Sequence, residues 1–137
     1  MRRLRILVLM HKDLVPPEQL NGQDLDAVAW KTEYDVVSTL RKLGHDVRAL
    51  GVKSDLEVIR AAVEDWKPHI AFNLLEEFDG MAVYDQNVVS YLELMHVPYT
   101  GCNPRGLMLA RDKALAKQVM SYHRIPYPEF MVVPLHR

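Results

Sequence analysis

Short apolar runs alternate with helix-like segments along the chain, and this alternation limits the possible folds more than any other feature. The runs that suit buried strands are residues 4–10, 45–52, 69–75 and 97–101. The segments in which apolar side chains recur every three or four positions are residues 26–43, 54–68, 84–95 and 103–123. Strands that alternate with helices fold as a parallel sheet with helices on both faces. We therefore predict an α/β domain built on a doubly wound parallel sheet.

The first helical segment has a clear buried face and a clear end. Trp30, Tyr34, Val37 and Leu40 share one face at helical spacing. Gly44 follows at the position where helices often end in a left-handed residue. We expect this helix to cover residues 26–43.

Capping signals mark the starts of three later helices. Ser54, with a glutamate three residues on, has the pattern of a capping box. Asn103 precedes a proline, which predicts an N-cap followed by a favoured first helical residue. Asp112 predicts a fresh helix start inside the last helical segment.

Composition narrows the class of protein. The chain has 137 residues, of which 49% are hydrophobic, and this suits one domain with one sizeable core. A net charge of −1 argues against nucleic acid or an anionic membrane as the partner. No apolar run approaches the roughly 20 residues of a membrane span. Cys102 is the single cysteine, so we expect a reducing compartment, the cytoplasm, and interpret Cys102 itself as a small thiol in a turn.

The loops after the first and third strands are the expected place of a binding site. In doubly wound sheets, ligands bind beyond the carboxyl ends of the strands, where the strand order reverses. Here the first loop begins at His11 and is long for a compact domain, and the third strand leads into Glu76, Glu77, Asp79 and Gly80.

The acidic loop has two open interpretations. Grouped carboxylates can receive an ammonium group, bind Mg²⁺ through oxygen or support proton transfer. The alternative is a solvated acidic loop with no ligand. His11 is equally open, because a histidine at a strand exit either contacts a ligand or merely ends the strand.

Lys113 and Lys117 lie four residues apart and so share a helix face. Like charges at this spacing repel mildly, and either a phosphate or water would relieve the repulsion. Neither of the common glycine-rich phosphate loops occurs in the sequence. Any nucleotide must therefore be bound by another kind of fold.

Three stretches together resemble a known family. They are FNLLEEFDG (72–80), VVSYLELMHVPYTGCNPRGLMLARDKALAKQVM (88–120) and IPYPEFMVV (125–133). Their order and spacing, over roughly residues 70–133, are similar to the N-terminal region of ATP-grasp ligases, especially D-alanine–D-alanine ligase and its relatives. The resemblance implies a Rossmann-like pre-ATP-grasp domain over residues 1–124. Residues 125–137 would begin the linker into an ATP-grasp domain.

The resemblance also implies an activity, that of an ATP-dependent carboxylate–amine ligase with an acyl-phosphate intermediate and Mg²⁺ on the polyphosphate. Carried over by position, Lys113 faces the nucleotide phosphates and Lys117 occupies a second position of the same motif. The substrate, an amino acid or another small carboxylate or amine, would meet the loops after the first and third strands. The substrate-side residues would be His11, Glu76, Glu77, Asp79 and Gly80.

The sequence departs from the family pattern at the substrate side. HKDLVPPEQLNG stands where those ligases carry a glycine-rich G-G-x-S-x-E segment, and EE replaces a histidine-glycine pair after the third strand. The resemblance therefore does not extend to D-alanine as the substrate.

The family pattern needs two further lobes to clamp ATP and supply the metal ligands. We expect the 137 residues to be one domain of a larger enzyme, inactive alone, with no metal site and no tight binding of ATP or Mg²⁺. Two alternatives remain open: a stand-alone α/β ligand-binding or regulatory module, and a structural domain that forms a homodimer.

Overall fold

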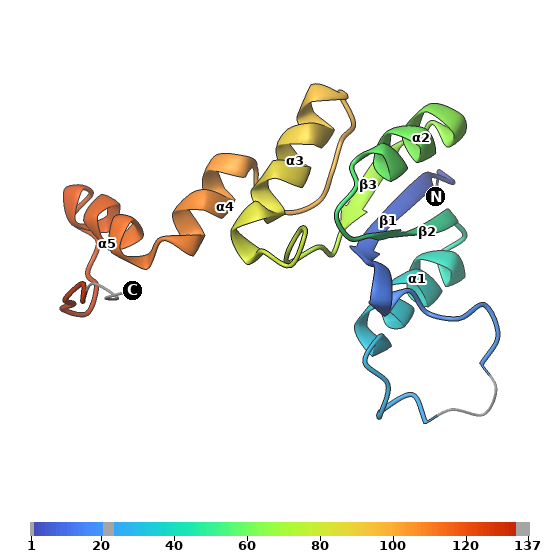
Figure 1. The fold of residues 1–137 in the computed structure, drawn as a ribbon, viewed down its shortest axis with the longest axis horizontal. Helices are drawn as coiled ribbons and strands as arrows, with labels where there is room; N and C mark the ends of the chain where they lie inside the picture. Colours follow the sequence, from blue (N-terminus) through green and yellow to red (C-terminus); the bar gives the residue numbers. More distant parts are fainter. Residues whose placement is uncertain (1, 21–23, 134–137) are drawn as a thin grey trace.

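The computed structural model describes residues 2–20 and 24–133 and contains a parallel sheet that packs between helices (Figure 1). The strands are β1 (Arg5–His11), β2 (Asp46–Val52) and β3 (Ile70–Asn73), in the order β2-β1-β3. The chain thus starts in the middle strand, moves to one edge and then crosses to the other. This topology confirms the predicted doubly wound α/β fold.

The predicted fourth strand, residues 97–101, is reduced to a single bridge between Ala71 and Tyr99. The Ala71 amide donates to the Pro98 carbonyl at 2.8 Å, and the Thr100 amide donates to the Ala71 carbonyl at 3.0 Å. Pro98 has no amide hydrogen to extend the ladder, and Gly101 leaves extended geometry with a φ of +97°. The segment therefore lies beside β3 without forming a full strand.

Helices cover both faces of the sheet. Helix α1 (Lys31–Lys42) lies on one face, and α2 (Glu57–Trp66) and α3 (Asp85–Leu94) lie on the other. The remaining helices are α4 (Pro104–Arg111) and α5 (Lys113–Tyr122), and there are short 3₁₀ turns η1 (Lys12–Leu14) and η2 (Ala82–Tyr84). Alternate side chains of β1 point to opposite faces, as the strand period requires. Val8 is buried with Val37 of α1, whereas Leu9 is buried with Ile59 of α2 and Leu92 of α3.

Local capping signals were confirmed at three places. Gly44 follows α1 with a φ of +86°, the left-handed conformation that glycine adopts without strain. The Asn103 carboxamide oxygen accepts from the Gly106 amide at 2.8 Å and caps α4. The Asp112 carboxylate accepts from the Leu115 amide at 2.9 Å and starts α5.

Two predicted helix starts were wrong. Helix α1 begins at Lys31, not at residue 26, because the Asp24 carboxylate accepts from the Asp26 amide at 3.0 Å and holds a turn there. Before α2, Asp55 accepts from the Glu57 amide at 2.8 Å, so the neighbouring Ser54 is not the capping residue.

Helices α4 and α5 extend away from the sheet (Figure 1). Helix α4 packs against α3, and α5 packs against α4. Residues 125–133 continue without helix or strand and are mostly exposed. The predicted boundary at residue 124 stays a prediction, and residues 134–137 of the predicted linker lie outside the described part of the chain. Within residues 2–20 and 24–133, no helix is long and apolar enough to cross a membrane.

Candidate functional site

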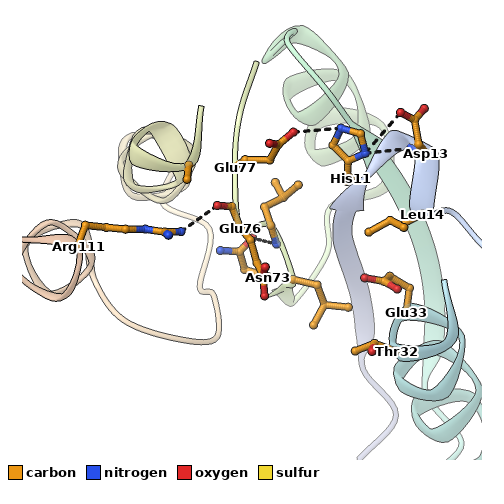
Figure 2. A pocket seen from close by; sticks show the side chains of 12 residues that line it. His11, Asp13, Leu14, Thr32, Glu33, Asn73, Glu76, Glu77 and Arg111 are labelled. Carbon is orange, nitrogen blue, oxygen red and sulfur yellow. Dashed lines mark hydrogen bonds and ion pairs between the residues drawn. The ribbon is translucent and has the colours of Figure 1, made fainter. Parts of the chain in front are cut away.

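A cleft of about 750 Å³ opens at the carboxyl ends of β1 and β3. These neighbouring strands flank the point where the strand order reverses, which is where the sequence predicted a site. The lining residues are His11, Asp13, Leu14, Thr32, Glu33, Asn73, Leu74, Leu75, Glu76, Glu77, Ala82 and Arg111. Figure 2 shows that they come from both loops, from the start of α1 and from α4.

His11 connects the first loop to the acidic loop. Its Nδ1 accepts from the Asp13 amide at 3.2 Å, so the ring proton of the neutral form sits on Nε2. Nε2 lies 3.3 Å from Glu77 Oε1 and can donate to it (Figure 2). This pair of contacts holds the Glu77 carboxylate at the cleft without requiring a charged imidazole.

The loop after β1 is seated on β2 at Gly51. A Cβ at Gly51 would lie 2.8 Å from Val15 Cγ2 and 3.0 Å from Lys12 Cα, closer than side chains approach. The missing side chain therefore allows the first loop to rest on β2. This contact fixes the direction in which His11 and Asp13 leave the sheet.

Arg111 of α4 ties the acidic loop to the helices. Its Nη2 donates to the Glu76 carbonyl at 2.8 Å (Figure 2). The same Nη2 donates to Asp85 Oδ2 at 2.6 Å, and Nε donates to that carboxylate oxygen at 3.2 Å. The contact to Glu76 uses the main chain, so the Glu76 carboxylate stays available at the exposed rim of the cleft.

Asp79 and Gly80 form a tight turn beside the cleft. Phe78 and Met81 exchange two backbone hydrogen bonds of 3.2 and 3.1 Å across this turn. Asp79 has a φ of +55° and Gly80 a φ of +72°, the positive values that two-residue hairpin turns require. The Asp79 amide also donates to the Lys53 carbonyl at 2.7 Å.

The structure thus brings together part of the predicted substrate-side set. His11, Glu76 and Glu77 line the cleft, whereas Asp79 and Gly80 do not. A substrate role for all five residues stays a prediction. The Asp-Gly pair is itself a common hairpin-turn sequence, and it explains these two residues without a ligand.

Two buried acids at or near the site were missed from the sequence. Glu33 is 7% exposed and Asp85 is 3% exposed. Glu33 lies four residues before buried Val37, and Asp85 lies three residues before buried Val88, so each acid occupies the apolar stripe of its helix. A carboxylate on the apolar stripe of a helix is the signal in the sequence that could have identified both acids. Within the described part of the chain, Glu33 Oε2 and Asp85 Oδ1 lack hydrogen-bond partners.

The two predicted nucleotide-side lysines lie on α5, outside the cleft. Lys113 lines a shallow hollow with Val83 and Met108, and Arg111 borders both this hollow and the cleft. Lys117 Nζ lies 4.8 Å from the centre of the Phe130 ring, within cation–π range. A role with phosphate stays a prediction for both lysines.

The described residues do not form a ready-made cluster of metal ligands. Among residues 2–20 and 24–133, no three histidine, cysteine, aspartate or glutamate side chains gather closely enough to hold one. No step that depends on Mg²⁺ is therefore assigned to this chain.

Comparison with known proteins gives one consistent result, although no family model matches the chain. D-alanine–D-alanine ligase of Acidiphilium cryptum is 34% identical over 100 residues, which are 73% of this chain and 32% of that protein. The enzyme of the same name from Oleidesulfovibrio alaskensis is 32% identical over 121 residues, covering 82% of this chain and 37% of that protein. The chain therefore spans about one third of the length of these curated relatives.

Solved structures show the same fold. A crystal structure of D-alanine–D-alanine ligase from Bacillus anthracis complexed with ATP matches with a TM-score of 0.67. The match has 21% sequence identity and covers 94% of this chain and 38% of that protein.

Proposed function

Because the chain is homologous to the N-terminal region of D-alanine–D-alanine ligases, we propose that it is the substrate-side domain of an ATP-dependent carboxylate–amine ligase. The observation that carries the proposal is 32% identity to one such ligase over 82% of the chain. A cleft at the switch point of the sheet supports it, because ligands of doubly wound domains bind there.

The proposed reaction has two steps. A substrate carboxylate oxygen attacks the γ-phosphorus of ATP, which forms an acyl phosphate and releases ADP. The nitrogen of an amine then attacks the acyl carbon, loses a proton and displaces inorganic phosphate, leaving an amide.

The cleft of this chain would hold one of the two organic substrates. His11 positions Glu77, and Glu76 faces the rim, so the cleft presents carboxylates to a polar substrate. Lys113 and Lys117 would lie toward the nucleotide. This use of ATP places the proposed enzyme in the cytoplasm, where the single Cys102 would stay reduced.

The test is ADP formation by the complete product of the gene that encodes this chain. With ATP and Mg²⁺ present, we expect ADP to form only when both a carboxylate and an amine are supplied. Lys113→Met should raise the KM for ATP, whereas Lys42→Met, which alters an exposed lysine at the end of α1, should not. The 137-residue chain alone should release no phosphate. ADP formation that is independent of both organic substrates would contradict the proposal and indicate an ATPase, whereas no ADP formation with any pair of substrates would contradict it and favour a binding module.

A further inference from the structure

Glu33 is a buried carboxylate that the fold of the chain does not explain. It lies in the first turn of α1, where the helix dipole favours a negative charge, but the dipole supplies no hydrogen-bond donor. The residue is 7% exposed, and among the described residues Oε2 has no donor. A buried carboxylate oxygen without a donor destabilises the folded state. In Figure 2 the side chain points from α1 toward the cleft, beside Leu14.

The charges around the cleft do not balance. Its carboxylates are Asp13, Glu33, Glu76 and Glu77. Lys53 lies 3.6 Å from the Asp13 carboxylate, and His11 Nε2 lies 3.3 Å from Glu77 Oε1. Within residues 2–20 and 24–133, Glu33 and Glu76 form no ion pair.

The one guanidinium at the cleft does not correct the imbalance. Arg111 is bound to the Asp85 carboxylate and to the Glu76 carbonyl. Its positive charge is therefore already paired with Asp85 and does not offset Glu33 or Glu76. A neutral zwitterion would leave its own negative end without a matching cation in the described cleft.

A metal ion is a poor candidate for the missing positive charge. Metal ions need several ligands at about 2–2.6 Å, and the described acids do not gather in a group of three. Acids that are spread along a cleft instead suit a ligand whose positive charges are also spread. The cleft volume of about 750 Å³ is ample for an aliphatic compound of this kind.

We propose that the cleft binds an aliphatic ligand that carries two cationic nitrogens and no carboxylate, such as a diamine. Glu33 receives the inner ammonium group, and Glu76 receives the outer one at the rim. If the ligase function proposed above holds, this ligand is the organic substrate held by the domain. Binding itself does not depend on that function.

The test is a calorimetric titration of the 137-residue chain at low ionic strength. The probes are 1,4-diaminobutane, butylamine, alanine and magnesium chloride. We expect the diamine to bind at least about tenfold more tightly than butylamine, because each matched ammonium adds to the affinity. Alanine and Mg²⁺ should bind more weakly than the diamine. Tighter binding of alanine or Mg²⁺, or equal binding of both amines, would overturn the proposal.

Glu33→Gln separates a binding role from a structural one. The variant should raise the melting temperature of the free chain, because it removes a buried charge, and should weaken diamine binding about tenfold. Glu64→Gln, which alters an exposed acid on α2, is the matched control and should change neither. Unchanged diamine binding in Glu33→Gln would overturn the assignment.

Glu76→Gln tests the outer position if Glu33→Gln does not fold. Glu76 is exposed, so its substitution should leave the fold intact and still weaken diamine binding, and unchanged affinity would overturn the proposal. Diamine binding without ATP-dependent ligation by the complete gene product would overturn the ligase function alone. Ligation with no preference for a diamine would overturn this inference alone.

Discussion

The link between Arg111 and Asp85 gives a quantitative prediction about stability. Asp85 is almost fully buried, with 5% of its side chain exposed, whereas 41% of the Arg111 side chain is exposed. Removing one partner of a fully buried pair costs about 3–5 kcal/mol. Loss of an exposed pair costs about 0–1 kcal/mol. Because only the acid is buried, we expect Arg111→Met to lower the free energy of unfolding by about 2 kcal/mol.

The cost arises mainly from the carboxylate that is left behind. In Asp85→Asn the Arg111 guanidinium loses its charged partner and is solvated by water instead. This variant should lower the free energy of unfolding by about 1 kcal/mol, the ordinary value of a lost hydrogen bond. In the double variant no buried charge remains. We therefore expect the double variant to be more stable than Arg111→Met alone, by about 1 kcal/mol.

Urea denaturation followed by circular dichroism at equilibrium measures these differences. The slope of the unfolding free energy against urea concentration should stay constant across the variants, so that differences in the unfolding midpoint report differences in stability alone. Arg105→Met, at an exposed arginine of the same helix, is the matched control and should change stability by less than about 0.5 kcal/mol. The reasoning is refuted if Arg111→Met resembles this control, or if the double variant is less stable than Arg111→Met.

Three further substitutions test the core, the first loop and one ionisable group. Leu92→Ala removes a fully buried side chain and should cost about 2–5 kcal/mol in urea denaturation, and a loss below 1 kcal/mol would contradict the core described here. Gly51→Ala should cost about 1–3 kcal/mol and shift the NMR signals of the His11 ring, because the new methyl group would push the first loop off β2; unchanged signals would speak against that contact. The Tyr99 hydroxyl donates to Glu93 at 2.7 Å, which raises the pKa of Tyr99 to about 12. This folded pKa lies above the value of about 10 in unfolded chains. The stabilisation of the folded state by the Tyr99–Glu93 hydrogen bond is therefore complete below about pH 10 and is lost as the pH rises toward 12. Tyr99→Phe should remove that loss, and an identical pH profile in the variant would refute the assignment.

Local signals in the sequence were enough to predict most of the framework. The run around Leu7 and Leu9 predicts a strand buried on both faces, because its side chains alternate between two layers of helices. Gly44, Asn103 and Asp112 predict helix ends because capping depends on residues that are neighbours in sequence. The cleft also appears where the order of strands and helices placed it.

The composition of the site depends on contacts between distant segments, and these could not be predicted. Arg111 reaches Glu76 and Asp85 across 35 and 26 residues, and neither distance leaves a local pattern. Glu33 did carry a signal in the sequence, because it is an acid on the apolar stripe of a helix. Helical spacing predicts that the residue is buried but does not show which other segments surround it. Asp79 is predicted as a substrate-side residue from the neighbouring acids, and that role stays a prediction; its backbone forms a hairpin turn, which the positions of the acids in the sequence do not show.

The proposal that this chain belongs to a carboxylate–amine ligase is tested most directly by following oxygen. The complete gene product is supplied with ATP, an amine and a carboxylate substrate labelled with ¹⁸O. In an acyl-phosphate mechanism the attacking carboxylate oxygen leaves with the phosphate, so mass spectrometry should find one ¹⁸O atom in the inorganic phosphate for each amide formed. Unlabelled phosphate, or label in AMP, would contradict the account.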